Sequence, residues 1–502
     1  MSKVLLIYPE FLLREGPSFN VPISMLQLGS YVESKGVQVR LIDCNIEGNY
    51  MNAIYDELDS SVCVGISAMT AHLPSAMQIS RDIKKKAGYK GPLVLGGVHP
   101  TLFPRQTVLD DLFDFAVVGE GELSFCELLE HIQGKRAMSN VEGVAYLDQN
   151  RAPQVISRQV SFDFNEMPPV NYGLLSRKIV DQFEDNYVGM LTSRGCPHKC
   201  TFCINVSVKE NNRWRAWGPK RMADEIEHAM KFGARKIWFW DENFFVNKKR
   251  IEEFLDEIEA RALHFPWSAE VRADYFRKFI SNELMGRLKE HGCKKLAMGA
   301  ESGSKKMLDI YCKEIEVDDI HEAARKCVSW GIQPTFSFMI GAPGEDKNDM
   351  ELTIKAIKKL YDISINMRVL GPQLFRPYPG STLYKKCLES GWKEPATLEE
   401  WASIVSTDFK ANDVFSSPWI GDPELVNTIW FYSIFLCVDI RKLIRLFREY
   451  CEIYGRSRLF KLIGSVGVVV VSLLGRLRYK MNFHKLQFEI KLLRKFRSVL
   501  SS

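Results

Sequence analysis

The sequence predicts an α/β protein in three parts: a doubly wound parallel sheet at the N-terminus, a partial (β/α)6 barrel of the TIM type, and a C-terminal helical region. Three observations predict it. The 502 residues exceed what one hydrophobic core usually holds. Short β-branched runs alternate with amphipathic stretches for most of the chain, and the pattern then becomes helical. The expected parts are residues 1–150, a linker at 151–186, the barrel at 187–395 and the helical region at 396–502.

Composition agrees with a folded cytoplasmic protein. Hydrophobic residues make up 46% and charged residues 26% of the chain. The start, MSKVLLIYPE, has a single lysine before an apolar run too short for a signal sequence, so export is not expected. Twelve cysteines in such a chain predict metal ligation rather than disulfides, because cytoplasmic thiols stay reduced.

In the first part, strand-like runs separated by helical patterns predict a Rossmann-like sheet; they are KVLLIY, VQVRLI, VCVGIS, PLVLGG and FDFAVVG. Sheets of this class bind ligands at the carboxyl ends of their strands, where glycine-rich turns are the usual signal. The segments LIDCNIEG, GISAM and LGGVHP fall at those ends.

Residues 151–186 lack a sustained period and predict a linker. Six further strand-like runs follow, and the first five each precede a helical stretch; they are VGMLT, KIWFW, WSAEVR, KLAMGA, TFSFMI and MRVLGPQLF. They predict an open or closed barrel with its site at the carboxyl ends of the strands. Gly292 and Gly331 are expected to end the helices after the third and fourth strands.

One cysteine cluster stands out. TSRGCPHKCTFC spaces Cys196, Cys200 and Cys203 as C-x3-C-x2-C directly after the first barrel strand. Three soft thiolates on a short loop can hold a [4Fe–4S] cubane and leave its fourth iron without a protein ligand. The alternative is structural zinc, with His198 or Cys293 as a fourth ligand. The position after a barrel strand, without a second cysteine pair, favours the cluster.

This motif, with Phe202 before its last cysteine, resembles the radical S-adenosylmethionine superfamily. The resemblance implies that the free iron chelates S-adenosylmethionine and that reduction cleaves it to a 5′-deoxyadenosyl radical. It also implies S-adenosylmethionine contacts at successive strand ends, from Asp241, Glu242, Arg272, Glu301, Ser302, Ile340 and Gly341. Asp241-Glu242 stands where the family usually has a Gly-Gly-Glu-like segment. Taken singly, each residue could equally cap a helix, pair with a charge or form a turn.

The N-terminal segments resemble the cobalamin-binding domain of methionine synthase and mutases. The matching residues are Asp43, Gly48, Ser67, Gly96 and Gly97, with Asn45 where the axial histidine would stand. Because an amide oxygen is a weak cobalt ligand, the resemblance implies cobalamin with its own base displaced. Further expected contacts are His99, Gly119 and Glu120. The alternative is a flavodoxin-like domain without a ligand, in which Glu120 only begins a helix.

Together these resemblances imply a cobalamin-dependent radical S-adenosylmethionine enzyme, similar to the anaerobic magnesium-protoporphyrin monomethyl ester cyclase and the radical C-methyltransferases. The favoured reaction is methylation of an unactivated carbon. The alternatives are oxidative ring formation without methyl transfer and a radical methylthiotransferase acting on tRNA. The last would need a second cysteine set, for which the N-terminal part offers Cys44, Cys63 and Cys126. A non-catalytic metal- or corrin-binding scaffold is a further possibility.

Residues 441–502 hold fifteen Lys or Arg against three Glu. With two uncharged runs of fourteen residues, Leu425–Val438 and Leu462–Gly475, too short to span a bilayer, they predict peripheral contact with the inner membrane face. Nucleic acid is the less favoured partner because Lys461 and Arg476 bracket the second run. Alternatively, these residues form a helical cap over the barrel and contact no partner. The other expected partners are a small-molecule substrate, of lipid or isoprenoid type, and an electron donor of the flavodoxin or ferredoxin type.

Overall fold

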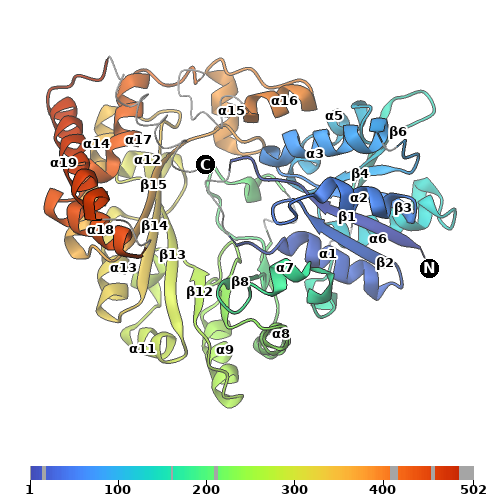
Figure 1. Cartoon of the computed structure of the whole chain (residues 1–502), viewed down its shortest axis with the longest axis horizontal. Helices are drawn as coiled ribbons and strands as arrows, with labels where there is room; N and C mark the ends of the chain where they lie inside the picture. The colour runs from blue at the N-terminus through green and yellow to red at the C-terminus, as the bar shows by residue number, and fades with distance from the viewer. Residues whose placement is uncertain are drawn as a thin grey trace.

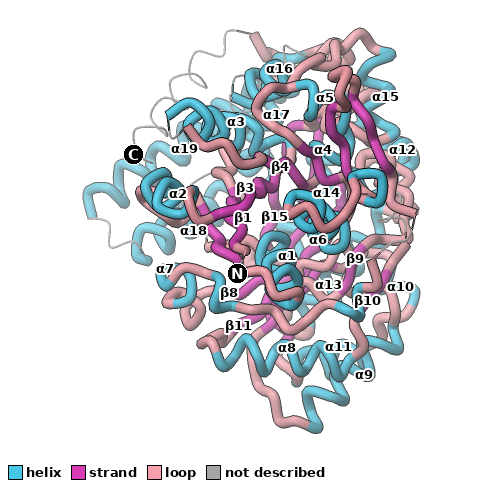
Figure 2. The backbone as a smooth tube through the Cα atoms, turned by 90° about the vertical axis from the view of Figure 1, so that its right-hand side faces the viewer, coloured by secondary structure: helices cyan, strands magenta, loops and turns pink. Residues whose placement is uncertain are grey.

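The structure is a computed structural model, which describes residues 2–13, 19–86, 88–159, 162–208, 213–406, 417–453 and 458–485. Two α/β units stand side by side, and the last helices cover the side of the barrel that faces away from the N-terminal unit (Figure 1). In the turned view, strands form the interior and helices lie around them (Figure 2). Part of the basic tail, residues 454–457 and 486–502, lies outside the described residues.

The N-terminal sheet has seven strands in the order β2-β1-β3-β4-β5-β6-β7. The first five pair in parallel, and the last two add antiparallel at one edge. This confirms the predicted doubly wound sheet. The strands are β1 (Lys3–Tyr8), β2 (Gln38–Asp43), β3 (Ser61–Ser67), β4 (Leu93–Gly96), β5 (Phe115–Val117), β6 (Val144–Leu147) and β7 (Pro153–Ile156).

Both faces of this sheet are buried. In β1, Leu5 and Ile7 pack in one apolar cluster, whereas Val4 and Leu6 pack in another. A strand buried on both faces reads as a continuous apolar run, as KVLLIY does. The helices of this unit are α1 (Ile23–Ser34), α2 (Tyr50–Leu58), α3 (Leu73–Arg81), α4 (Val98–Leu102), α5 (Pro104–Leu109) and α6 (Gly121–Ile132).

The segment predicted as a linker contains structure of its own. Strand β7 lies within it, and Pro153 takes the first place of that edge strand, where no ladder hydrogen bond is lost. The short helix α7 (Arg177–Val180) follows. The backbone N–H of Val170 donates to the buried carboxylate of Glu225 in the barrel unit, which ties the segment down. The domain boundaries themselves stay a prediction.

The barrel consists of six parallel strands in the order β15-β14-β13-β12-β11-β8. Because this order ends at β8 and β15 without joining them, the barrel is open. All six predicted strands are present. They are β8 (Tyr187–Met190), β11 (Lys236–Phe239), β12 (Trp267–Glu270), β13 (Cys293–Glu301), β14 (Gln333–Ile340) and β15 (Arg368–Leu374). Two short strands, β9 (Ser193–Arg194) and β10 (Arg215–Ala216), pair beside it.

Helices cover the outside of the barrel. Gly292 and Gly331 follow helices α11 and α13 with φ angles of +91° and +62°, the left-handed conformation that ends helices. The helices of this unit are α8 (Pro219–Lys231), α9 (Lys248–Ala260), α10 (Tyr275–Lys278), α11 (Asn282–Glu290), α12 (Lys305–Ile310), α13 (Val317–Ser329) and α14 (Lys347–Ile363).

The chain after the barrel first returns to the N-terminal unit, where α15 (Thr382–Glu389) and α16 (Leu398–Ile404) lie (Figure 1). Trp401 of α16 packs edge-to-face on His99, with ring centroids 5.6 Å apart. Helix α17 (Pro423–Cys437) then packs on α14 and β15, and α18 (Ile440–Ile453) and α19 (Arg458–Lys480) complete the chain. Within the described ranges, no helix is long and apolar enough to cross a membrane.

The buried carboxyl of Glu225 makes the stability of the fold depend on pH. Burial raises the pKa of its carboxyl from 4.5 to about 7. The folded protein therefore holds this proton more tightly than the unfolded chain, and the stability it contributes is lost as pH rises from about 4.5 through 7. We expect Glu225→Gln, which keeps an acceptor for Val170, to gain stability relative to wild type by on the order of 3 kcal/mol between pH 5 and pH 8. Denaturant unfolding at both pH values measures it, and a pH-independent difference would contradict it.

Candidate active site

The cysteine loop leaves the carboxyl end of β8 and is anchored by its own backbone. The N–H of Thr201 donates to the carbonyl of Tyr311 at 2.9 Å, and the N–H of Leu383 donates to the carbonyl of Thr201 at 2.8 Å. Cys200 is buried, and Cys196 and Cys203 are partly exposed. The loop is thus fixed from α12 and α15 while two of its thiols stay accessible.

The geometry does not favour the zinc alternative. Cys293 is the first residue of β13, so it lies at the opposite end of the barrel from the loop. The His198 imidazole contacts Tyr275, with Nε2 2.8 Å from the phenol oxygen. Asn243 donates to the same oxygen at 2.9 Å. Burial and the nearby Arg272 cation lower the pKa of His198, which favours the neutral ring.

Asp241 supports the strand before the cysteines. Its fully buried carboxylate accepts from the backbone N–H of Thr192 at 2.6 Å and from the hydroxyls of Thr192 and Ser193 at 2.7 and 2.6 Å. Burial raises the pKa of Asp241, and Arg250 and these hydrogen bonds oppose the rise. Asp241 therefore holds the loop in place, and its neighbour Glu242 is the residue of the pair that faces open space.

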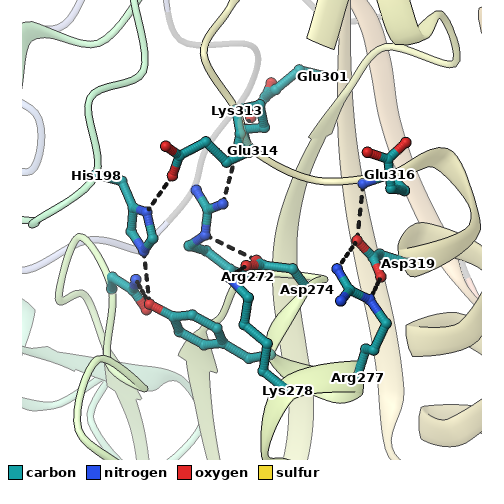
Figure 3. Close-up of polar contacts among 12 residues, drawn as sticks. His198, Arg272, Asp274, Arg277, Lys278, Glu301, Lys313, Glu314, Glu316 and Asp319 are labelled. Atoms are coloured by element: carbon teal, nitrogen blue, oxygen red, sulfur yellow. Dashed lines mark hydrogen bonds and ion pairs between the residues drawn. The ribbon is translucent and has the colours of Figure 1, made fainter. Parts of the chain in front are cut away.

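A charged network lies beside the loop on the third and fourth strand ends (Figure 3). Arg272 donates to Asp274 at 3.0 Å and to the carbonyl of Lys313. The Lys313 ammonium lies 3.0 Å from the Glu301 carboxylate and 5.7 Å from the centre of the Phe202 ring. Two buried cations thus stand next to the cysteine motif, each paired with a carboxylate.

Glu301 occupies a strained position. Its φ angle is +63°, which is uncommon for a residue with a side chain. A Cβ on Gly299 would lie 2.0 Å from the Glu301 carboxylate and 2.8 Å from the Lys313 ammonium, so glycine leaves the room that the ion pair fills. Backbone strain of this kind persists where surrounding contacts fix it, and it gathers at functional sites.

Ser302, Ile340 and Gly341 are packed into the same end of the barrel. The Ser302 hydroxyl lies 3.0 Å from that of Thr353, and Ile340 is fully buried. Gly341 adopts a φ angle of +78°, and its carbonyl accepts from the Trp419 indole at 2.8 Å. The structure thus brings the predicted S-adenosylmethionine residues to one end of the barrel; their contacts with the ligand stay predictions.

A cavity of about 280 Å³ lies between the two units. Five of the expected cobalamin residues line it: Ser67, Gly96, Gly97, Gly119 and Glu120. The barrel contributes Leu191, Arg194, Val208 and Glu242. The carboxyl ends of the N-terminal strands and the segment that leads into the cysteine loop therefore border the same cavity.

The cavity fits the nucleotide base that cobalamin displaces from its metal. Glycines form its floor: a Cβ on Gly65 would meet Leu6 at 2.9 Å, and one on Gly97, at a φ angle of +97°, would meet the Ala68 carbonyl at 2.9 Å. Apolar side chains such as Val117 and Phe125 form its walls. A flat aromatic base suits such a lining, with exposed backbone and the Ser67 hydroxyl as polar partners.

Four expected cobalamin contacts lie elsewhere. Asp43 ends β2, the edge strand, and Asn45 and Gly48 follow it; none of the three lines the cavity. The Asn45 amide instead accepts from the N–H of Phe11 at 3.0 Å and donates to the carbonyl of Pro9 at 3.1 Å, so it fixes the loop after β1. His99 is fully buried beside Thr70 and Trp401. The cobalamin role of these residues stays a prediction.

The comparisons with known proteins match this geometry. Residues 190–357 match the radical SAM superfamily model, and residues 11–129 match the B12 binding domain model. An uncharacterized methyltransferase of Pyrococcus horikoshii is 28% identical over 80% of this chain and 87% of its own. The anaerobic magnesium-protoporphyrin IX monomethyl ester cyclase of Cereibacter sphaeroides is 27% identical over 58% of this chain and 48% of its own.

The fold has a solved counterpart. The structure of OxsB, a cobalamin-dependent S-adenosylmethionine radical enzyme, superposes with a TM-score of 0.68 at 15% identity, over 99% of this chain and 80% of that one. The open barrel with its three-cysteine loop is a radical S-adenosylmethionine domain, and the sheet before it is a B12-binding domain. The chain therefore combines a radical S-adenosylmethionine domain with a B12-binding domain, and these two domains imply a [4Fe–4S] cluster, S-adenosylmethionine and cobalamin as cofactors.

The N-terminal cysteines are not arranged for a second cluster. Cys44 packs in the apolar core on one face of the sheet, and Cys63 and Cys126 pack with the core on the other face. The sheet separates them. This arrangement disfavours the methylthiotransferase alternative.

Three residues near the loop were not predicted from the sequence: Arg194, Tyr275 and Lys313. Arg194 precedes the motif by two residues, and its spacing was the only signal that could have singled it out. Tyr275 and Lys313 follow strand ends by several residues, and no motif marks them. Only the folded backbone brings them to the cysteines.

Removing the Asp241 carboxylate should loosen the cysteine loop. Asp241→Ala leaves buried donors on Thr192 and Ser193 without acceptors, which costs on the order of 1–3 kcal/mol for each unsatisfied group. We expect lower iron content after anaerobic reconstitution and a lower unfolding temperature. Asp256→Ala, which breaks a surface ion pair with Arg287, is the control. Equal iron content and stability in the two variants would show that Asp241 does not support the loop.

Proposed function

We propose that this enzyme methylates an unactivated carbon of a small molecule. One observation carries the proposal: Arg194 and Glu242 of the radical domain line the same cavity as the glycine turns of the B12-binding domain. The group that carries a methyl and the loop that generates a radical therefore meet at one interface. Ring formation needs the radical but does not by itself require a methyl carrier at this position.

The reaction balances with two S-adenosylmethionine molecules. One is cleaved reductively to methionine and a 5′-deoxyadenosyl radical, which takes a hydrogen atom from the substrate carbon to give 5′-deoxyadenosine. The other would donate the methyl of the new C–C bond, with bound cobalamin as the methyl carrier, and would leave as S-adenosylhomocysteine. Two electrons are consumed, one for the cleavage and one to restore the cobalt, and we propose a flavodoxin- or ferredoxin-type donor for both.

The chain's own residues would position these partners. Arg272 and Lys313 place positive charge beside the cysteine motif, suited to the carboxylate of S-adenosylmethionine. Tyr275 and Asn243 orient His198 within the loop. Ser67, Gly96 and Gly97 would hold the displaced base of cobalamin. These groups bind and orient, which supplies the near-attack geometry that radical transfer requires.

The test is product analysis with methyl-labelled S-adenosylmethionine. We expect the anaerobically reconstituted enzyme, given a chemical reductant and extracts of a deletion strain, to form 5′-deoxyadenosine and S-adenosylhomocysteine in equal amounts and a product carrying the label. Cys200→Ala should abolish 5′-deoxyadenosine, because the cluster loses a ligand. Cys126→Ala, outside the loop, should retain it.

The alternative outcomes are distinct. Substrate-dependent 5′-deoxyadenosine without S-adenosylhomocysteine or label in the product would establish ring formation or oxidation instead. Loss of cluster iron in Cys126→Ala would support the methylthiotransferase alternative, because that enzyme needs a second set of cluster cysteines. A chain that never cleaves S-adenosylmethionine would be a binding scaffold.

We also propose that the enzyme is cytoplasmic, contacts an anionic membrane face and acts on a lipid- or isoprenoid-type substrate. The two uncharged runs differ: Leu425–Val438 falls mainly on α17, which packs on the barrel, whereas α19 turns an apolar face outward. Its exposed residues follow helical spacing; they are Leu462 (60% exposed), Val466 (57%), Val470 (48%), Leu473 (55%) and Leu477 (55%), and Met481 (66%) comes directly after the helix.

Basic side chains are exposed on the two C-terminal helices. Arg441 and Arg445 of α18, which packs on α19, expose 95% and 64% of their side chains and pair with Asp439 and Glu449, and Lys480 is the last residue of α19. An exposed apolar stripe next to positive charge fits the headgroup layer of an anionic bilayer. The position of α18 and α19, on the side of the barrel away from the N-terminal unit, leaves the interface between the units free (Figure 1).

Vesicle sedimentation tests the contact. We expect binding to vesicles that contain phosphatidylglycerol, little binding to pure phosphatidylcholine, and at least about tenfold weaker binding for Leu473→Ser with Leu477→Ser, since each loses roughly 1.5–3 kcal/mol of apolar burial. Leu109→Ser, exposed on the N-terminal unit, is the control. Unchanged vesicle binding in the double variant, or a dimer in solution that the double variant abolishes, would contradict the proposal.

A further inference from the structure

Four charged side chains join the two domains at the stem of the cysteine loop. Strands β9 and β10 flank the loop, and their register places Arg194 directly opposite Arg215. Like charges in a cross-strand pair are destabilising. Here the repulsion is offset from the other domain, by Glu120 and Glu122 at the start of α6.

The contacts are close and specific. Arg215 binds Glu120 with two parallel hydrogen bonds of 2.8 Å. Arg194 lies 3.3 Å from Glu120 and 2.6 Å from Glu122. The four side chains expose only 4–14% of their surface. If the domains parted, two arginines would stand opposed on a short ladder, and two carboxylates would lose their partners.

The same groups border the cofactor cavity. Arg194, Glu120 and Glu122 line it together with Ser67 and Gly97. Arg194 is also close to the cysteine loop, because it comes two residues before Cys196 in the sequence. Its guanidinium lies 4.8 Å from the centre of the Phe164 ring. A ligand in the cavity therefore restrains the stem of the cysteine loop, and an ordered loop restrains the cavity wall.

We propose that this charge clamp makes cobalamin binding and cluster assembly cooperative. The two sites share Arg194 and its carboxylate partners, so each cofactor that binds fixes side chains that the other needs fixed. Linkage requires the effect to be reciprocal. The proposal rests on the cofactor set of the enzyme and is independent of whether methyl transfer follows.

Binding measurements test the clamp directly. Hydroxocobalamin is titrated by equilibrium dialysis into the full-length protein, with and without its reconstituted cluster. In wild type we expect the cluster to tighten binding by about tenfold, within the usual range of coupling between two sites. In the reciprocal experiment, hydroxocobalamin should raise the yield and slow the loss of cluster iron under a chelator.

The variants separate coupling from direct contact. In Glu122→Gln and Arg215→Gln, the dissociation constants for hydroxocobalamin with and without the cluster should become nearly equal. Arg194→Lys keeps the positive charge and should therefore retain part of the difference between them. Glu127→Gln is the matched control, since Glu127 lies on the same helix but pairs with Arg158 inside its own domain, at 2.6 Å. It should behave as wild type.

Two results would overturn the proposal. If the clamp variants weaken hydroxocobalamin equally with and without the cluster, these residues only contact the corrin. If wild type itself shows one dissociation constant in both states, the sites are independent. Should Arg215→Gln fail to fold, Glu122→Gln and the wild-type comparison still decide the question.

Discussion

The structure depends on the neutralisation of two opposed arginines. Arg194 and Arg215 form the stem from which the cysteine loop projects, and their partners Glu120 and Glu122 come from the other domain. A stem of this composition is stabilised only when the domains are docked. The docking in turn creates the cavity and places it against the loop. Two units with separate sheets thereby share one interface between their functional ends.

The remainder of the chain reinforces that docking. Glu225 binds the connecting segment to the barrel, and α16 brings Trp401 back onto His99 of the N-terminal unit. On the barrel side, Asp241 and the carbonyl of Tyr311 fix the loop from two directions. The cysteines thus sit on a short segment whose position is set by buried polar contacts. Such support limits the positions that the three cysteines can take.

Some residues that were predicted from motifs also have a structural role in the fold. Asp241 matches the position of a cofactor contact, and its carboxylate accepts hydrogen bonds from Thr192 and Ser193 before the cysteine loop. Asn45 matches the place of an axial ligand, yet it fixes the loop after β1. In both cases a polar side chain at a strand end has two possible uses, binding a ligand or satisfying a nearby backbone group. Spacing alone does not distinguish them.

The sequence by itself determined the two α/β patterns, all eleven predicted strands, the three-cysteine motif and the glycine turns at the strand ends. These are local properties, because hydrophobic periodicity and thiolate spacing are read within a few residues of the chain. The tertiary structure alone decided that Lys313 pairs with Glu301 beside Phe202, that Glu120 faces Arg194, and that α17 is core while α19 is surface. Those contacts join residues far apart in sequence, and their partners are set by how whole elements dock.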